Sequence, residues 1–272
     1  KFTLFIYCIP MNALVLFIDF SLNSTMKKKV FITGASSGIG EYLAYAYAKQ
    51  GCFIGLVARR KDRLDQVATQ CSKFGGQTKV YAVDVLNGSD CKKAIDDFIA
   101  LPGEMDTIYA NAGVGSPDGL SSGSAEKMNH VLSVNILGVT NTVMPFLPHL
   151  KEIRKGKIAI ISSVASFRGL AHHAAYSGSK AAVRNMSQGW GTALHKYGIS
   201  FTAVCPGFIK SEMTEDNAFP MPFLMETNVA VQKIMHAVGR RKKVFIFPWQ
   251  MKYFMIPLMK WAPDWMFRRF GM

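Results

Sequence analysis

A tyrosine and a lysine four residues apart, Tyr176 and Lys180, are the side chains in this sequence best suited to proton chemistry. They begin a segment of helical period, where residues i and i+4 lie on one face, so the phenol and the ammonium point the same way. A tyrosine with a pKa of about 10 is a poor acid or base at neutral pH, but a neighbouring ammonium lowers that pKa. The pair predicts a tyrosine that exchanges a proton with a substrate oxygen, although the spacing is also compatible with packing and solvation alone.

A glycine-rich turn, residues 33–40 with the sequence TGASSGIG, joins a short apolar run to an amphipathic segment. Glycines let the backbone turn tightly and approach a pyrophosphate, which the free amides and the dipole of a helix N-terminus then bind. The spacing Gly-x-x-x-Gly-x-Gly is typical of one branch of dinucleotide folds. The residues predicted to contact a dinucleotide here are Gly34, Ser36, Ser37, Gly38, Ile39 and Gly40.

The residues after the second apolar run indicate which dinucleotide is bound. In such folds an acidic side chain about 20 residues beyond the glycines binds the ribose 2'-hydroxyl of NAD, whereas an arginine accommodates a 2'-phosphate. Here Arg59 and Arg60 follow the run, and the first carboxylate is Asp62. NADP(H) is therefore predicted over NAD(H). The alternative is that Arg59 and Arg60 merely form a solvated turn, but this would not explain why no acidic side chain stands where NAD-binding folds have one.

The order of apolar segments predicts how these residues are positioned. Short β-branched runs alternate with longer segments of helical period, which is typical of βαβ units and a parallel sheet. Strands are predicted at 30–32, 53–58, 79–83, 107–109, 157–161, 200–204 and 244–247, and helices at 39–50, 61–74, 88–100, 125–154, 174–197 and 226–239. We predict an α/β fold with a single Rossmann-type, doubly wound domain over residues 26–248, in which helices flank a seven-stranded parallel sheet.

The composition bounds the class of protein. The chain has 272 residues, of which 49% are hydrophobic and 18% charged, so it can bury a sizeable core and is not a disordered or collagen-like chain. Its five cysteines are scattered and odd in number, which excludes a disulfide framework and suits a reducing compartment. No pair of histidines has a convincing metal spacing with carboxylates, so no metal site is expected.

The two ends are unusual. Residues 1–25 form an apolar extension, predicted to be either an anchor or a dispensable stretch before Met26; the dispensable stretch is favoured. The last 33 residues hold eight cations against the single acid Asp264, in a chain of net charge +14, and aromatic residues interleave with them. The tail 249–272 therefore resembles an interfacial membrane segment more than a nucleic-acid arm. A flap whose aromatics pack on the core is the equally supported alternative.

Residues 211–225, rich in Phe, Met and Pro, have no clear period and follow the sixth predicted strand. Ligands of open α/β sheets bind outside the carboxyl ends of the strands. The stretch is therefore predicted to be an apolar lid over the site, with an ordinary surface loop as the alternative.

Taken together, these motifs resemble those of the short-chain dehydrogenase/reductase family over residues 29–248. The family's catalytic serine is expected 13 residues before the tyrosine, where Ser163 stands, with Ser162 as a structural neighbour; the catalytic asparagine corresponds to Asn135. The remaining cofactor-contacting positions that the resemblance implies are Asp84, Val85, Asn111, Ala112, Gly113, Pro206, Gly207, Ile209 and Ser211. Serine stands at 211 where threonine is usual in the family.

The resemblance implies hydride transfer between a nicotinamide and a carbonyl or alcohol carbon. Tyr176 would donate the proton, Ser163 would hydrogen-bond the reacting oxygen, and Lys180 would bind the nicotinamide ribose and lower the pKa of the tyrosine. Asn135 would hold a water that links Lys180 to solvent. The resemblance also implies a homodimer or homotetramer paired through the helices 125–154 and 174–197.

We expect an NADP(H)-dependent carbonyl reductase acting on a lipophilic ketone or aldehyde, in the cytoplasm and in peripheral contact with a membrane through the tail. No nucleic-acid partner is expected. The enzymatic alternative is a 3-oxoacyl thioester reductase, whose acidic carrier protein would be attracted to the positive surface. The remote alternative is a nucleotide-sensing scaffold without catalysis, against which the complete set of catalytic residues argues.

Overall fold

The protein is described by a computed structural model that covers residues 27–215 and 221–261. The predicted N-terminal extension, the middle of the predicted lid and the end of the tail lie outside the described residues.

Seven parallel strands form one sheet in the order β3-β2-β1-β4-β5-β6-β7, which confirms the predicted doubly wound sheet. The strands are β1 (Lys28–Thr33), β2 (Phe53–Ala58), β3 (Gln77–Ala82), β4 (Glu104–Ala110), β5 (Gly156–Ile161), β6 (Ile199–Pro206) and β7 (Val244–Phe247). The strand order reverses between β1 and β4. The crevice that open α/β sheets use for ligands therefore lies at the carboxyl ends of these two strands.

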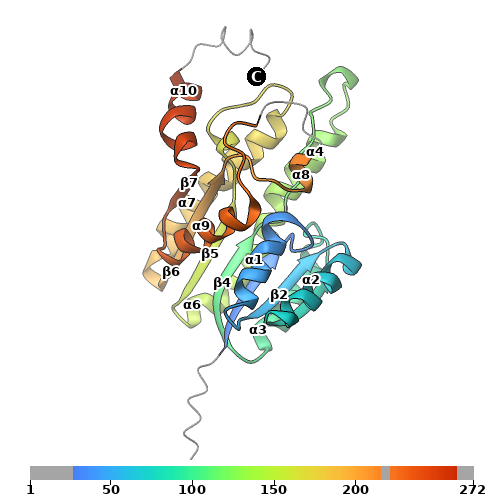
Figure 1. The fold of residues 1–272 in the computed structure, drawn as a ribbon, viewed down its shortest axis with the longest axis vertical. Helices are drawn as coiled ribbons and strands as arrows, with labels where there is room; N and C mark the ends of the chain where they lie inside the picture. The colour runs from blue at the N-terminus through green and yellow to red at the C-terminus, as the bar shows by residue number, and fades with distance from the viewer. Residues whose placement is uncertain (1–26, 216–220, 262–272) are drawn as a thin grey trace, which may run out of the picture.

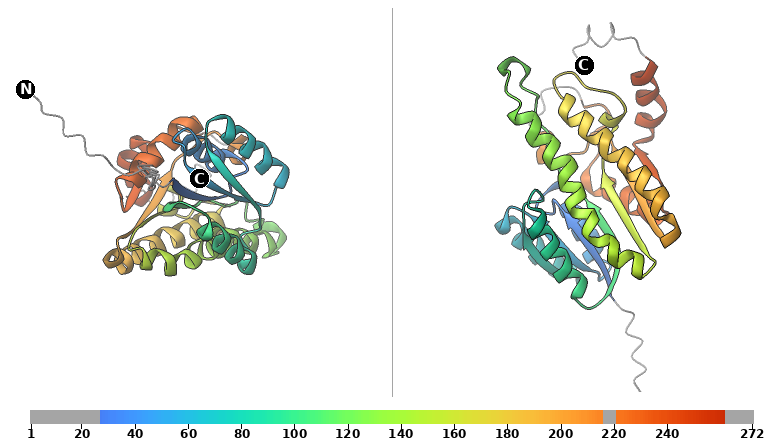
Figure 2. Two further views of the ribbon diagram at one scale, coloured as in Figure 1. Left: turned by 90° about the horizontal axis from the view of Figure 1, so that it is seen from below. Right: turned by 180° about the vertical axis from the view of Figure 1, so that it is seen from behind.

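Helices cover both faces of the sheet, so the domain has three layers (Figure 2). One face carries α1 (Gly38–Ala48), α2 (Lys61–Lys73) and α9 (Thr227–Gly239), and the other carries α3 (Gly88–Ala100), the helical segment 126–152 and α7 (Ala174–Leu194). Leu43 and Ile234 are buried in the first helix-to-sheet layer, and Phe98 and Val183 in the second. Burial of each apolar helix stripe against the sheet is the main source of stability in such a layered fold.

The helix predicted over 125–154 follows one path but is not one regular helix, and this corrects the prediction. It consists of α4 (Glu126–Leu132), a π-helical segment η2 (Ser133–Leu137), α5 (Gly138–Val143), a 3-10 turn η3 (Met144–Phe146) and α6 (Leu147–Glu152). Pro145 and Pro148 lack the amide hydrogen that a regular helix needs, which accounts for the irregular second half. Within the described residues, this segment is long and apolar enough to cross a membrane, but it packs on the sheet and on α7, as a core helix does.

After β7 the chain continues as η6 (Met251–Met255) and α10 (Ile256–Trp261). Figure 1 shows α10 in red at the end of the molecule where the strands have their carboxyl ends. Met251 and Ile256 are buried, so this part of the tail is docked on the domain by one apolar edge.

Candidate active site

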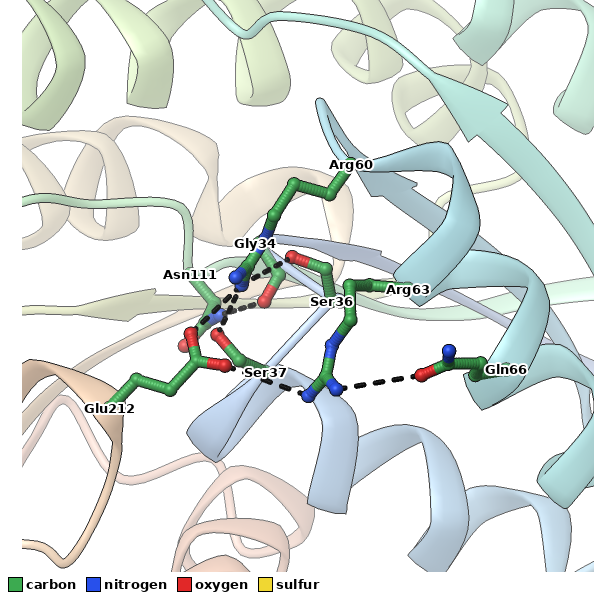
Figure 3. A network of polar contacts seen from close by, with 8 residues as sticks. All are labelled: Gly34, Ser36, Ser37, Arg60, Arg63, Gln66, Asn111 and Glu212. Atoms are coloured by element: carbon green, nitrogen blue, oxygen red, sulfur yellow. Dashed lines mark hydrogen bonds and ion pairs between the residues drawn. The ribbon is translucent and has the colours of Figure 1, made fainter.

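The glycine turn after β1 is held by the residues that follow β4. The side-chain amide of Asn111 donates to the carbonyl oxygens of Thr33 and Gly34 at 2.9 and 3.2 Å (Figure 3). Gly34 has φ +66°, and a Cβ on Gly40 would lie 2.2 Å from the carbonyl oxygen of Gly34. Only glycine fits at position 40. The sequence therefore permits the close turn that a phosphate-binding loop needs.

The N-terminus of α1 opens directly from this turn. Its N-cap, Ser37, is extended, and its hydroxyl makes no capping hydrogen bond, so it leaves the first amides of the helix available to an anion. Ser36 is buried, and a Cβ on Gly38 would lie 3.3 Å from the Cβ of Ser211. The segment after β6 therefore closely approaches the helix start, whose free amides suit an anion.

Three arginines, Arg59, Arg60 and Arg63, follow β2, and Arg60 contacts the glycine turn. Arg60 Nη2 donates to the hydroxyls of Ser36 and Ser37 at 3.2 and 3.0 Å and pairs with Glu212 Oε2 at 2.9 Å (Figure 3). Arg63 Nη2 lies 3.5 Å from the other oxygen of Glu212. Arg59 is exposed and lies 3.9 Å from Asp84. The sequence analysis identified Arg59, Arg60 and Asp84 but missed Arg63 and Glu212.

The remaining predicted cofactor residues surround this crevice. Thr33 Oγ1 accepts from the backbone amides of Asn111 and Ala112. Val85 is buried, and its carbonyl accepts from the side-chain amide of Asn141 at 2.8 Å. The first pair of contacts joins the end of β1 to the loop after β4, and the last joins the segment after β3 to α5.

Tyr176 and Lys180 lie on α7, and Ser163 stands at the start of the 3-10 turn η4 (Val164–Phe167) after β5. Lys180 is buried; its Nζ donates to the carbonyl oxygen of Ile161 at 2.9 Å and lies 5.7 Å from the ring centre of Tyr176. Ser162 is taken up structurally, because its hydroxyl donates to the carbonyl oxygen of Lys180. The structure therefore brings Ser163, Tyr176 and Lys180 together at the carboxyl end of β5.

Burial shifts the pKa values of both the tyrosine and the lysine. Burial raises the pKa of Tyr176, and a hydrogen bond with Ser163 opposes the rise only in part. Burial also lowers the pKa of Lys180 to about 8. In the chain alone, loss of hydration is therefore the largest influence on the pKa of each group. A neutral phenol is the form that can donate a proton.

Asn135 occupies the π-helical segment η2 and is completely buried. Its amide nitrogen donates to the carbonyl oxygen of Val114 and to Ser179 Oγ, both at 3.0 Å, while its oxygen accepts from the Val114 amide. A Cβ on Gly113 would lie 3.0 Å from both Asn135 Oδ1 and Lys180 Nζ. The side chain therefore ties the loop after β4 to α7 beside the lysine, and the predicted water stays a prediction.

Asp118, which the sequence analysis did not single out, caps the helix that carries Tyr176. Its two carboxylate oxygens accept from the amides of Ala174 and Ala175 at 2.5 and 3.0 Å, and its own amide donates to the carbonyl oxygen of His172. The side chain is buried. A local helix cap can be read from sequence as Ser, Thr, Asp or Asn followed three residues later by Glu or Gln. The cap of α7 comes instead from a distant loop, so this signature could not reveal it.

The segment after β6 crosses the mouth of the crevice. Pro206 ends β6, the amide of Gly207 donates to Phe247, and Ile209 pairs with Met225 in an isolated bridge. Ser211 precedes the short helix α8 (Glu212–Glu215). A Cβ on Gly115 would lie 3.6 Å from the Tyr176 ring and 3.9 Å from Met213 Sδ, so both side chains flank Gly115. Residues 216–220 of the predicted lid lie outside the described residues.

The docked part of the tail contacts the loop after β5. Arg168 donates to the carbonyl oxygen of Met259 at 2.6 Å, and Lys260 Nζ lies 5.6 Å from the ring centre of Phe167. The opposite side of this helical segment is exposed and aromatic. Its exposed large side chains are Trp249, Tyr253, Phe254, Leu258 and Trp261. One edge of the described part of the tail thus packs on the core and the other faces solvent, and the membrane contact stays a prediction.

Comparison with known proteins identifies the family. The family model described as short chain dehydrogenase matches residues 28–219. An uncharacterized oxidoreductase of Myxococcus xanthus is 35% identical over 224 residues, which are 82% of this chain and 88% of the relative. The 11-beta-hydroxysteroid dehydrogenase-like 2 protein of Arabidopsis thaliana is 36% identical over 233 residues, 83% of this chain and 75% of the relative.

The solved structure of a 3-ketoacyl-ACP reductase from Sinorhizobium meliloti covers 80% of this chain with 96% of its own length, at a TM-score of 0.72 and 25% identity. Together with the family model and the close approach of Ser163, Tyr176 and Lys180 at the carboxyl end of β5, these findings show that the chain belongs to the short-chain dehydrogenase/reductase family of oxidoreductases.

Proposed function

We propose that this chain uses NADP(H) to reduce a ketone or aldehyde on a lipophilic substrate, or to oxidise the corresponding alcohol. The cofactor supplies the hydride. In the reduction, the Tyr176 hydroxyl donates a proton to the carbonyl oxygen, the Ser163 hydroxyl positions that oxygen, and Lys180 binds the nicotinamide ribose. The observation that carries the proposal is the convergence of these three residues beside Asn111, Ala112 and Gly113, next to the glycine turn.

The preference for NADP(H) rests on charge at the end of β2. Arg59, Arg60 and Arg63 lie within one turn of chain there, and the first residue after the strand is an arginine rather than an acid. Guanidinium groups bind phosphate through charge-assisted, forked hydrogen bonds. The Asp84 carboxylate, 3.9 Å from Arg59, is placed to orient that arginine rather than to bind a ribose hydroxyl itself.

The lipophilic substrate is inferred from the residues around the mouth. Met213 lies near Gly115, which also approaches the Tyr176 ring, and Phe223 and Leu224, about half exposed at 47% and 46%, follow in the same segment. Apolar side chains at a cleft favour an apolar ligand. The test is a panel of ketones and aldehydes graded by chain length, with turnover followed by loss of NADPH absorbance. We expect kcat/KM to rise with chain length; a preference for short polar carbonyls would contradict the proposal.

A 3-oxoacyl thioester reductase is the second candidate, favoured by the positive surface of the chain and by the likeness to the 3-ketoacyl-ACP reductase. An acidic carrier protein would be attracted by that charge, so turnover of carrier-bound substrate would fall steeply with salt. Turnover of a free lipophilic ketone would change little. Measuring both at low and high salt separates the two candidates.

The exposed aromatic side of η6 and α10 supports peripheral contact with the cytoplasmic face of a membrane. Lys252 and Lys260 lie on the same segment, and residues 240–261 contain no acid. Aromatic side chains suit the membrane interface, and each lysine gains about 1 kcal/mol near an anionic leaflet. The neighbouring entrance at the carboxyl ends of the strands would then face the source of a lipophilic substrate.

A homodimer or homotetramer is the proposed assembly. Leu137, Met144 and Ile153 are exposed apolar side chains on or next to the helical segment 126–152. Such side chains gain free energy when a second copy buries them. Sedimentation of the full chain would test the assembly.

A further inference from the structure

Glu212 pairs with two of the three arginines that follow β2. Its Oε2 lies 2.9 Å from Arg60 Nη2 and its Oε1 lies 3.5 Å from Arg63 Nη2. Arg60 Nη2 also donates to Ser36 and Ser37, so one guanidinium nitrogen joins the glycine turn to α8 (Figure 3). The carboxylate therefore stands where an anion bound by the arginines would stand.

This ion pair is weak enough to be replaced. The side chains of Arg60 and Glu212 are each 47% exposed, and ion pairs at such a surface contribute little because water screens them. Arg60 and Arg63 hold the pKa of Glu212 below its usual range, so the group is charged at neutral pH. A phosphate monoester carries close to two negative charges at that pH and three acceptor oxygens, which makes it a stronger partner for the same guanidinium groups.

We infer that Glu212 determines cofactor specificity as an internal competitor for the 2'-phosphate site formed by Arg60 and Arg63. A cofactor with a 2'-phosphate displaces the Glu212 carboxylate from Arg60. A cofactor with a 2'-hydroxyl leaves the pair in place. Glu212 therefore weakens the binding of NADP(H) selectively, and it couples the position of α8 to the chemical form of the cofactor. The inference rests on the proposed binding of NADP(H).

The test compares wild-type protein with Glu212→Gln, which keeps the size of the side chain and removes its charge. Isothermal titration is carried out with adenosine 2',5'-bisphosphate and adenosine 5'-monophosphate, and then with NADPH and NADH. We expect the variant to bind the bisphosphate and NADPH about three- to fivefold more tightly, because an exposed ion pair has an effect of this order. Binding of the monophosphate and NADH should change less than about twofold.

Glu215→Gln is the matched control, because Glu215 lies on the same helix and carries the same charge but makes neither of these arginine contacts. All four ligands should bind this variant as they bind wild type. In an Arg60→Gln background, the effect of Glu212→Gln should shrink to less than half.

Two results would overturn the inference. Equal gains for both members of each ligand pair would show a general charge effect, and weaker binding of all ligands would show that Glu212 clamps the site. Failure of the proposed NADP(H) preference has a different signature: wild-type protein would bind NADH as well as NADPH. The role of Glu212 is tested by the ratio of the dissociation constants of variant and wild type for each ligand. That ratio does not depend on which cofactor the wild-type protein prefers.

Discussion

The buried carboxylate of Asp118 accepts a hydrogen bond from the backbone amide of Ala175, 57 residues further along the chain, at 3.0 Å. Its other oxygen accepts from the amide of Ala174. The loop after β4 therefore satisfies the free amides at the start of α7, and Tyr176 lies in the first turn of that helix. The orientation of the proposed proton donor depends on this cap.

Asp118→Ala should lower the free energy of unfolding by about 1 to 2 kcal/mol, because it removes an N-cap and leaves two amides without a partner. We expect kcat to fall while the Kd for NADPH changes little. Urea denaturation and steady-state kinetics measure the two effects. Asp62→Ala, in the exposed first turn of α2, is the control and should cost no more than about 0.5 kcal/mol. Equal losses in both variants would contradict the special role of Asp118.

Tyr176→Phe should abolish turnover and leave NADPH binding nearly intact, because it removes the hydroxyl and keeps the ring. General acid catalysis contributes about 10²- to 10⁴-fold, so the loss should be at least of this order. Single-turnover kinetics and fluorescence titration of NADPH measure chemistry and binding separately. Ser162→Ala serves as the comparison, since the Ser162 hydroxyl is bound to the Lys180 carbonyl and should not touch substrate. A Phe variant with wild-type turnover would exclude Tyr176 as the donor.

Stability should increase with pH through the titration of Lys180. Its pKa is about 8 in the folded chain and 10.5 when unperturbed, so between these values the unfolded chain binds more protons than the folded chain. The free energy of unfolding therefore rises with pH in this window, by at most about 3 kcal/mol, and this contribution is lost as the pH falls through about 8. Urea denaturation of wild type and Lys180→Met across the window should give curves that diverge with pH. Parallel curves would contradict the shift.

Arg59→Asp should weaken NADPH and favour NADH, because it replaces a phosphate-binding cation with an acid that can accept from the ribose 2'-hydroxyl. The loss of NADPH affinity should be about 10- to 100-fold, as for other hydrogen bonds to charged groups. Titration with both cofactors measures the change. Lys73→Asp, at the far end of α2, makes the same charge reversal and should leave the preference unaltered. An unchanged preference in Arg59→Asp would shift the assignment to Arg60.

Replacing Tyr253, Phe254 and Trp261 with serine should lower binding to anionic vesicles about tenfold or more, because these exposed rings are the residues suited to the interface. Flotation with vesicles containing phosphatidylserine, at low and high salt, measures the binding. Tyr42→Ser, at an exposed aromatic residue on α1, is the control. Absence of vesicle association by the wild-type chain at either salt would contradict the membrane contact and leave the docked helix as a structural flap.

Local patterns were sufficient for the features that depend on near neighbours in the chain. All seven strands and the helices α1, α2, α3, α7 and α9 follow the periods of their own residues, because an element that buries one face must repeat apolar side chains at its own period. The glycine turn was likewise predictable, since glycine is the only residue type that fits at position 40 against Gly34. Resemblance to the family added Ser163 and Asn135, which lie far from Tyr176 in sequence.

Tertiary structure decided which distant segments contact one another and how far burial shifts the pKa values of the site residues. Glu212 meets Arg60 across 152 residues, and Asp118 meets α7 across 57, so neither partner could be identified from local spacing. The i, i+4 spacing correctly put Tyr176 and Lys180 on one helix, but it could not show that burial raises the pKa of the tyrosine and lowers that of the lysine. Sequence sets which side chains share a face; only the packed chain determines how much water each charge loses, and that loss sets the pKa values at this site.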